Sequence, residues 1–273
     1  ELGYVEGRNL VIEARFGEGA GPERLEQLAH ELVALKPQVI VAQGGPATFP
    51  LYRTRTAIPV VMAYSGDPVE AKFAATYAHP GGNFTGMTFL SLELVGKRME
   101  LLKEVLPGLK RVAILANPEH PGQHGELRVS QAAAKDLGLV IDYFQVRGTA
   151  ELDEALAAIL KLRSDAIVQF PDALMMRYRE RIAQFSIDNR IPAISGWAPF
   201  ADSGNLMTYG PNQRAVFTRL ATFVDKILKG ANPATLPIEL PSSVELVLNL
   251  KAAKALGLSI PSSILARADR KIE

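Results

Sequence analysis

Residues 37–68 read PQVIVAQGGPATFPLYRTRTAIPVVMAYSGDP. Two short apolar runs, 39–42 and 59–63, flank a segment that opens on a Gly-Gly-Pro turn at 44–46 and is expected to be helical to about Thr56. A short apolar run between turn residues is typical of a buried strand, and strands that alternate with helices are typical of a parallel sheet. The stretch therefore predicts one βαβ unit of an α/β fold.

The same alternation continues along the chain on both sides of this unit. Further strands are expected at 10–16, 111–116, 140–146, 166–170, 193–195 and 206–209, and residues 84–89 are expected to form a strand or an extended link. Helices are expected at 22–35, 68–77, 92–105, 125–137, 151–162, 177–188, 213–228 and from 251. Residues 236–250 are expected to be extended, and Pro237 and Pro241 favour an edge or linker role for them. Two similar series of βαβ units predict two similar lobes of parallel sheet flanked by helices.

Turn residues interrupt the pattern at 89–92, 209–212 and 232–237, where we expect the chain to cross between the lobes. A length of 273 residues suits two lobes of ordinary domain size. The expected N-terminal lobe is 1–89 plus 211–236, and the expected C-terminal lobe is 90–210 plus 237–273. Two lobes connected by three chain crossings can move about them as about a hinge.

Composition excludes several classes of function. Thirty basic against 29 acidic residues leave a formal charge of +1, so no summed field favours nucleic acid or an anionic membrane surface. The absence of cysteine excludes disulfides, thiolate metal sites and a cysteine nucleophile. No run approaches the roughly 20 apolar residues of a membrane-spanning helix.

Two motifs resemble a cofactor-binding loop and a metal site, but neither meets the requirements of such a site. Residues 17–21, Gly-Glu-Gly-Ala-Gly, have the wrong spacing for a dinucleotide-binding loop, and Pro22 explains the break as a helix start. His120 and His124 are four residues apart, but Pro121 and Gly122 between them favour a solvated loop over a metal-binding helix. We expect no cofactor and no metal.

Neither candidate serine has the surroundings of a hydrolase nucleophile, because Ser65 and Ser195 both lack the G-x-S-x-G frame. What remains is a set of small or polar residues after successive strands, at 43–47, 65–67, 117–118 and 171–172. In open parallel sheets these strand ends border a crevice, where helix N-termini offer free N–H groups. The loops form the predicted pocket, although each alone is also ordinary turn chemistry.

Several blocks in order resemble one family of ABC transporter substrate-binding proteins, the group with tryptophan- and tyrosine-binding members. The matching segments are 1–10, 44–47, 66–69, 80–86, 209–211, 227–230 and 249–258. The resemblance implies a type I periplasmic-binding-protein fold, in which two Rossmann-like lobes joined by a three-strand hinge enclose the ligand.

The resemblance also implies a secretion signal, a first strand and a helix ahead of 1–10. None of the three is in this chain, which opens on Glu1-Leu2-Gly3-Tyr4, a pattern typical of a helix end with its glycine cap. We therefore expect the N-terminal lobe to lack its first strand. An unpaired sheet edge recruits other strands, so the chain is expected to pair with a second copy there or to rearrange its N-terminal region.

The loops and the resemblance together predict a set of ligand contacts. These are Gly44, Gly45, Pro46, Ala47, Ser65, Gly66, Asp67, Asn117, Pro118, Asp172, Ser195, Gly196, Trp197 and Tyr209. Loop amides and hydroxyls suit a carboxylate, and Asp172 or Asp67 suits an ammonium group. Trp197 is expected either to stack on a flat ligand or to anchor its own loop. Because the family often carries polar or charged residues at 196–197, ligand identity does not transfer from relatives.

The resulting expectation is a periplasmic or otherwise extracytoplasmic protein that captures an amino acid, an aromatic compound or a related organic acid. It would deliver this ligand to an ABC permease in the membrane and catalyse nothing. One alternative is a ligand-sensing clamp for a receptor, and another is a small α/β enzyme that uses the same crevice. Nucleic acid is not an expected partner. The chain is expected to form a homodimer through its N-terminal lobe.

Overall fold

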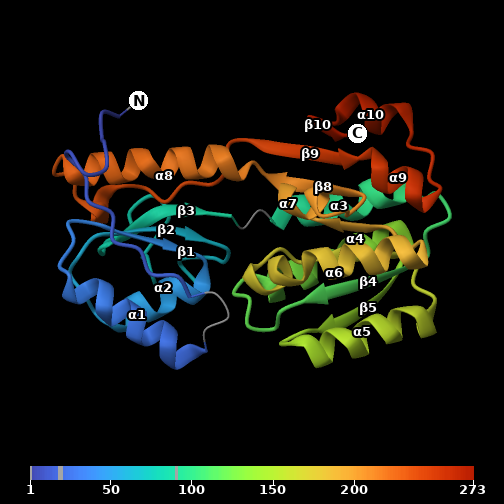
Figure 1. Ribbon diagram of the computed structural model, residues 1–273, viewed down its shortest axis with the longest axis horizontal. Helices are drawn as coiled ribbons and strands as arrows, with labels where there is room; N and C mark the ends of the chain where they lie inside the picture. Colours follow the sequence, from blue (N-terminus) through green and yellow to red (C-terminus); the bar gives the residue numbers. More distant parts are fainter. Residues whose placement is uncertain (1, 18–20, 90–91) are drawn as a thin grey trace. The chain divides into compact units, whose positions relative to one another are not determined.

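A computed structural model describes residues 2–17, 21–89 and 92–273 (Figure 1). The chain divides into two compact units. Unit 1 comprises Glu1–Leu90 and Arg214–Leu240, and unit 2 comprises Ser91–Gln213 and Pro241–Glu273. The junctions between the units thus follow residues 90, 213 and 240. The junctions expected from the sequence follow residues 89, 210 and 236.

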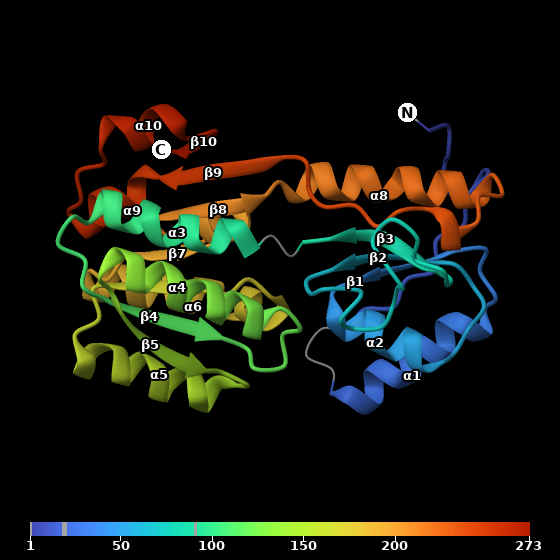
Figure 2. The same ribbon diagram turned by 180° about the vertical axis from the view of Figure 1, so that it is seen from behind.

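Unit 1 is a three-stranded parallel sheet in the order β1-β2-β3. Its elements are α1 (Pro22–Ala34), β1 (Ile40–Gln43), α2 (Gly45–Arg53), β2 (Val60–Tyr64), β3 (Phe84–Thr88), α8 (Gln213–Leu228) and the 3₁₀ turn Pro233–Thr235. Helices α1 and α2 lie on one side of this sheet and α8 lies on the other (Figures 1 and 2). Strand β2 is fully buried and contributes to the apolar core on both faces of the sheet. Met62 packs toward α1 and α2, and Val61 packs toward α8.

The strand expected at 10–16 is wrong. Leu10 forms only an isolated bridge with Glu6, residues 11–16 belong to no strand, and Val11 and Phe16 are 80% and 79% exposed. A strand needs a neighbour for its backbone hydrogen bonds, and within the described residues β1 pairs only with β2. The N-terminal segment is attached by side chains instead, with Tyr4 Oη donating to Asp225 at 3.0 Å and Arg15 paired with Glu31 at 2.9 Å. A β-type pattern without a partner strand therefore does not form a strand.

The helix expected at 68–77 is also wrong, because the chain forms a series of turns there. Lys72 adopts the left-handed conformation with φ +63°, which ends the helical path after one turn. Phe73 is thereby placed against Tyr64, at 5.0 Å between ring centroids, and stacks on Phe84. Tertiary packing of this aromatic cluster overrides the local helical pattern.

Unit 2 is a seven-stranded sheet in the order β10-β9-β8-β7-β6-β4-β5, parallel except where β8 meets β9. Its helices are α3 (Leu92–Val105), α4 (Gln123–Leu137), α5 (Thr149–Leu162), α6 (Ala173–Asn189), α7 (Ala198–Asp202), α9 (Leu250–Leu256) and α10 (Ser262–Arg267). Its strands are β4 (Arg111–Ala116), β5 (Val140–Gln145), β6 (Ala166–Gln169), β7 (Ala193–Ser195), β8 (Met207–Pro211), β9 (Val244–Asn249) and β10 (Arg270–Ile272). Helices α3 and α4 pack on one face and α5 and α6 on the other (Figures 1 and 2).

The edge role expected within 236–250 is wrong for its strand, because β9 lies between β8 and β10. Pro237 and Pro241 both precede β9, so neither removes a hydrogen bond from it. The short strand β10 takes the sheet edge, and the sequence pattern does not reveal it. The motif at 17–21 and the crossing at 89–92 each include residues outside the described part of the chain, although Pro22 does open α1.

Replacing Gly86 by alanine should destabilise unit 1. Gly86 lies in β3 with φ +126°, and a Cβ atom there would sit 2.3 Å from the carbonyl oxygen of Met62. The backbone strain alone is expected to lower the free energy of unfolding by about 1–3 kcal/mol, measured by urea denaturation. Gly82→Ala is the matched control, because Gly82 has open space around it. Equal stability of the two variants would contradict the close approach of β3 to β2.

Candidate functional site

Three loops meet where the central strands of the unit 2 sheet end. Asn117 follows β4, Asp172 follows β6 and Gly196 follows β7, and these strands are neighbours in the sheet. Because the strands are parallel, their carboxyl ends lie at the same edge. Asn117 Nδ2 donates to Asp172 Oδ2 at 2.7 Å, so the structure brings two of the predicted contacts together.

Asp172 is both a helix cap and a buried carboxylate. Its Oδ1 accepts the backbone N–H of Met175 at 2.7 Å, which caps α6. The side chain is 6% exposed, and burial raises the pKa of Asp172 above the ordinary 3.8, although the hydrogen bonds from Met175 and Asn117 oppose that rise. Each carboxylate oxygen retains a lone pair beyond the bond it accepts. Asp172 can therefore receive a charge-assisted hydrogen bond from a ligand.

A buried group of ionisable side chains lies beside these loops. Arg98 from α3 and Glu126 from α4 approach at 3.4 Å, and His120 Nε2 lies 3.1 Å from the other oxygen of Glu126. The three side chains are between 3% and 5% exposed. The prediction of a solvated loop at 120–124 is wrong for His120, because its side chain is buried in contact with Glu126. The backbone N–H of His120 also donates to the carbonyl of Asn117 at 3.0 Å, which ties the ionisable group to the strand-end loop.

Arg98 reaches two further predicted contacts. Its Nε donates to the backbone carbonyl of Tyr209 at 2.9 Å. A Cβ atom on Gly196 would lie 2.4 Å from Arg98 Nη2, and one on Gly210 would lie 1.9 Å from the carbonyl oxygen of Gly196. Glycine at both positions lets the loop after β7 lie directly on β8 and on the guanidinium.

Sequence reasoning missed Arg98, although a signal was available. Leu94, Leu101 and Val105 are all buried on α3, and Arg98 lies between them at helical spacing. A charged residue within an apolar stripe marks either a buried ion pair or a site.

Two predicted ligand contacts of unit 2, Ser195 and Trp197, make contacts with other residues of the protein. Ser195 is fully buried and its hydroxyl donates to the carbonyl of Gln169 at 3.0 Å. Trp197 precedes α7 and packs against the apolar cluster of α5 and α6, which is the loop-anchoring role expected as one alternative. Pro118, next to Asn117, is half-buried.

Unit 1 has its own pair of strand-end loops, after β1 and after β2. Helix α2 already begins at Gly45 and includes Pro46 and Ala47, and Gly44 before it has φ +77°. In the second loop the carbonyl of Gly66 accepts the hydroxyl of Thr88 at 2.9 Å, and Ser65 is buried. Asp67 accepts the N–H groups of Val69 and Glu70 at 2.7 and 3.2 Å, so it caps a turn.

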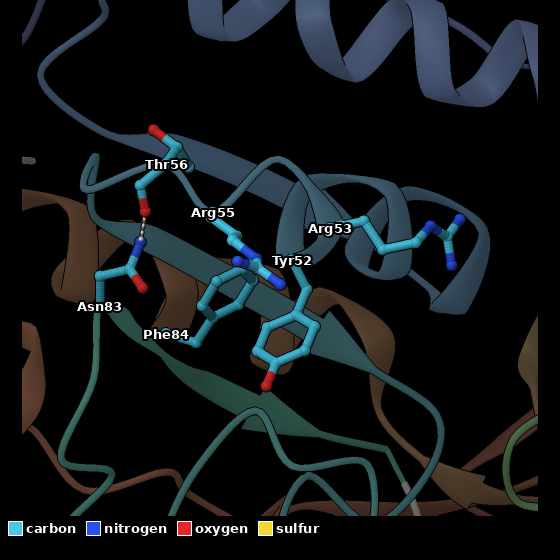
Figure 3. Close-up of a pocket in the computed structure, with 6 residues that line it drawn as sticks. All are labelled: Tyr52, Arg53, Arg55, Thr56, Asn83 and Phe84. Carbon is cyan, nitrogen blue, oxygen red and sulfur yellow. Dashed lines mark hydrogen bonds between the residues drawn. The ribbon is translucent and has the colours of Figure 1, made fainter.

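A cavity of about 430 Å³ lies at the opposite end of the unit 1 sheet (Figure 3). It is lined by Tyr52, Arg53, Arg55, Thr56, Asn83 and Phe84. Asn83 donates to the carbonyls of Thr56 and Ile58 at 2.9 and 2.7 Å, and Arg53 forms an ion pair with Glu26. Several of its polar groups thus hold the loop between α2 and β2, and none of its residues is a predicted contact.

Among the described residues, no three His, Asp or Glu side chains are grouped so that they could hold a metal ion. The helices of residues 2–17, 21–89 and 92–273 also include none with the length and apolar character to cross a membrane.

The family model described as ABC transporter substrate binding protein matches residues 1–272. The chain belongs to this family. It is 23% identical over 259 residues to a tyrosine-binding protein of Clostridioides difficile, a match that covers 94% of this chain and 74% of that protein. The assignment to a solute-binding component of an ABC importer is confirmed.

Solved structures agree with the fold. A conserved domain protein from Vibrio cholerae matches with a TM-score of 0.91 and 28% identity, over 98% of this chain and 90% of that one. A Streptococcus pneumoniae ABC domain in complex with L-Trp matches with a TM-score of 0.85 and 24% identity, over 93% and 85% of the two chains. The predicted class, an α/β periplasmic-binding-protein fold with parallel sheets flanked by helices, is confirmed.

Proposed function

We propose that this substrate-binding protein takes up an amino acid, with Asp172 as the acceptor of its ammonium group. The observation that carries the proposal is the buried Asn117–Asp172 pair at the strand ends of unit 2. Burying a carboxylate is costly unless a cation compensates it. Burial raises the pKa of Asp172 despite the opposing hydrogen bond from Met175 and the charge interaction with His120, and in the described parts of the chain no Lys or Arg side chain forms an ion pair with Asp172. A ligand ammonium group would supply that charge.

The relatives favour an aromatic amino acid. One is a tyrosine-binding protein, and the structure of another contains L-Trp. We propose tyrosine and tryptophan as the first ligands to test, with the loop of Gly196 and Trp197 bordering the ring. The loops of unit 1 at Gly44–Ala47 and Ser65–Asp67 are proposed as further contacts. In the first loop the donors would be the N–H groups of Gly45 and Ala47, because Gly44 already donates to Ala63 and Pro46 has no N–H.

We propose that the ligand leaves chemically unchanged for an ABC permease, because the family is defined by substrate binding. An extracytoplasmic location follows from the same role. A ligand-sensing clamp for a receptor would use the same binding step, and recovery of unaltered ligand separates both roles from an enzyme.

Substituting Asp172 by asparagine should weaken binding of L-tyrosine or L-tryptophan by about 2–5 kcal/mol, because a buried charge pair is lost. Asparagine is also a good helix N-cap, so α6 should persist. Isothermal titration calorimetry provides the measurement, and Asp188→Asn, an exposed position on the same helix, provides the control. Unchanged affinity in Asp172→Asn would overturn the assigned role.

Binding should also depend on pH through Asp172. Only the ionised carboxylate pairs with an ammonium group, and burial places the pKa of Asp172 above 3.8. Affinity should therefore decline as pH falls through this raised pKa, starting at a higher pH than for an ordinary aspartate. Titrations across an acidic pH series test this, and the decline should be absent in Asp172→Asn. An equal decline in both proteins would assign the effect to another group.

We further propose that the open outer edge of β1 pairs with the same edge of a second copy. Val41 on this edge is 53% exposed, and an unpaired strand edge with an apolar side chain favours strand addition. Light scattering at increasing protein concentration should show a dimer that Val41→Lys abolishes. A monomer at all concentrations would exclude this pairing.

A further inference from the structure

Arg98 has one nitrogen, Nη2, with no hydrogen-bond partner among the described residues. Its Nε donates to the carbonyl of Tyr209 at 2.9 Å, and its Nη1 lies 3.4 Å from Glu126. Within the described residues Nη2 forms no hydrogen bond, although the side chain is 3% exposed. A guanidinium always carries its charge and has five N–H donors to satisfy. The two donors of Nη2 therefore call for an acceptor from elsewhere.

The one ion pair of Arg98 is long. Its Nη1 lies 3.4 Å from the carboxylate of Glu126, whereas His120 Nε2 lies 3.1 Å from the other oxygen of that carboxylate. An anion beside Nη2 would give the guanidinium a closer charged partner. In a buried setting such a charge-assisted hydrogen bond is stronger than a neutral one.

Nη2 lies at the same strand ends as Asp172. The position that a Cβ atom of Gly196 would occupy is 2.4 Å from Nη2 and 2.9 Å from Pro171, the residue before Asp172. Among the described residues, the polar atoms that are fully enclosed and lack a partner include the side-chain amide of Gln169 but not Nη2 of Arg98. Nη2 is therefore not fully enclosed, although it packs closely against Gly196.

We propose that Arg98 Nη2 binds the carboxylate of the ligand. This rests on the proposed function and deepens it, because Asp172 and Arg98 together would select a zwitterionic α-amino acid over an amine or an acid alone. The glycine at position 196 lets the guanidinium lie directly against the loop after β7, where a side chain would displace it. The N–H groups at the start of α2 are the competing donors to the carboxylate.

The test compares three ligands and two variants. L-tyrosine carries both charges, tyramine lacks the carboxylate, and 3-(4-hydroxyphenyl)propionate lacks the amine. Arg98→Lys retains a positive charge but removes the planar fork, and should weaken tyrosine and the propionate by about ten- to hundredfold while leaving tyramine within about twofold. Asp172→Asn should do the reverse, weakening tyrosine and tyramine but not the propionate.

Controls separate this role from a structural one. Arg128→Lys, at an exposed position on α4, should bind all three ligands like the wild type, and circular dichroism melts monitor the fold of each variant. If Arg98→Lys weakens all three ligands equally, its role is structural and the proposal falls. If it leaves the propionate unaffected, the carboxylate lies elsewhere, as at α2, and the proposal falls while the Asp172 assignment stands. If the wild type binds none of the three, both assignments fall.

Discussion

The compensation of one buried guanidinium is the constraint around which the strand ends of unit 2 are arranged. A charge removed from water must be matched by partners of good geometry, and each partner of Arg98 comes from a different element. Glu126 belongs to α4, the carbonyl of Tyr209 to β8 and the close contact at Gly196 to the loop after β7. Because none of these elements can shift without exposing the charge or leaving it unpaired, the loops are held in place before a ligand arrives.

The carboxylate of Asp172 has the complementary requirement. Its bonds from Asn117 and Met175 fix its orientation, but neither donor carries a charge. The strand ends of unit 2 therefore hold a buried carboxylate close to a buried guanidinium of α3, whose one ion pair, with Glu126, is 3.4 Å long. A ligand of the opposite charge pattern would satisfy both, and would bind to groups that are already oriented.

Much of the fold follows from the sequence, because buried parallel strands are short apolar runs whose hydrogen bonds join neighbours of the same kind. Residues 39–42 and 59–63 are of this type, and β1 and β2 form there. Residues 10–16 have a similar pattern but no partner strand, so no strand forms there. At 68–77 the packing of Phe73 against Tyr64 outweighs the local preference for a helix. Pairing and packing are properties of distant residues, which a local pattern does not contain.

The site was only partly predictable for the same reason. Asn117 and Asp172 follow directly from the rule that strand ends meet at one sheet edge. Arg98 lies in the middle of a helix, and the burial of His120 depends on Glu126, which lies beside it only in the folded unit. Both depend on contacts across the unit rather than on neighbours in sequence.

The uneven pairing of β1 has a consequence for the order in which unit 1 opens. The N–H groups of Ile40 and Gly44 bond to the carbonyls of Pro59 and Ala63 on the β2 side, whereas in an alternating ladder those of Val41 and Gln43 point outward. In a single copy of the chain, water competes for that outer row. Local unfolding should therefore begin at β1, and amide hydrogens there should exchange with solvent sooner than those of the enclosed β2.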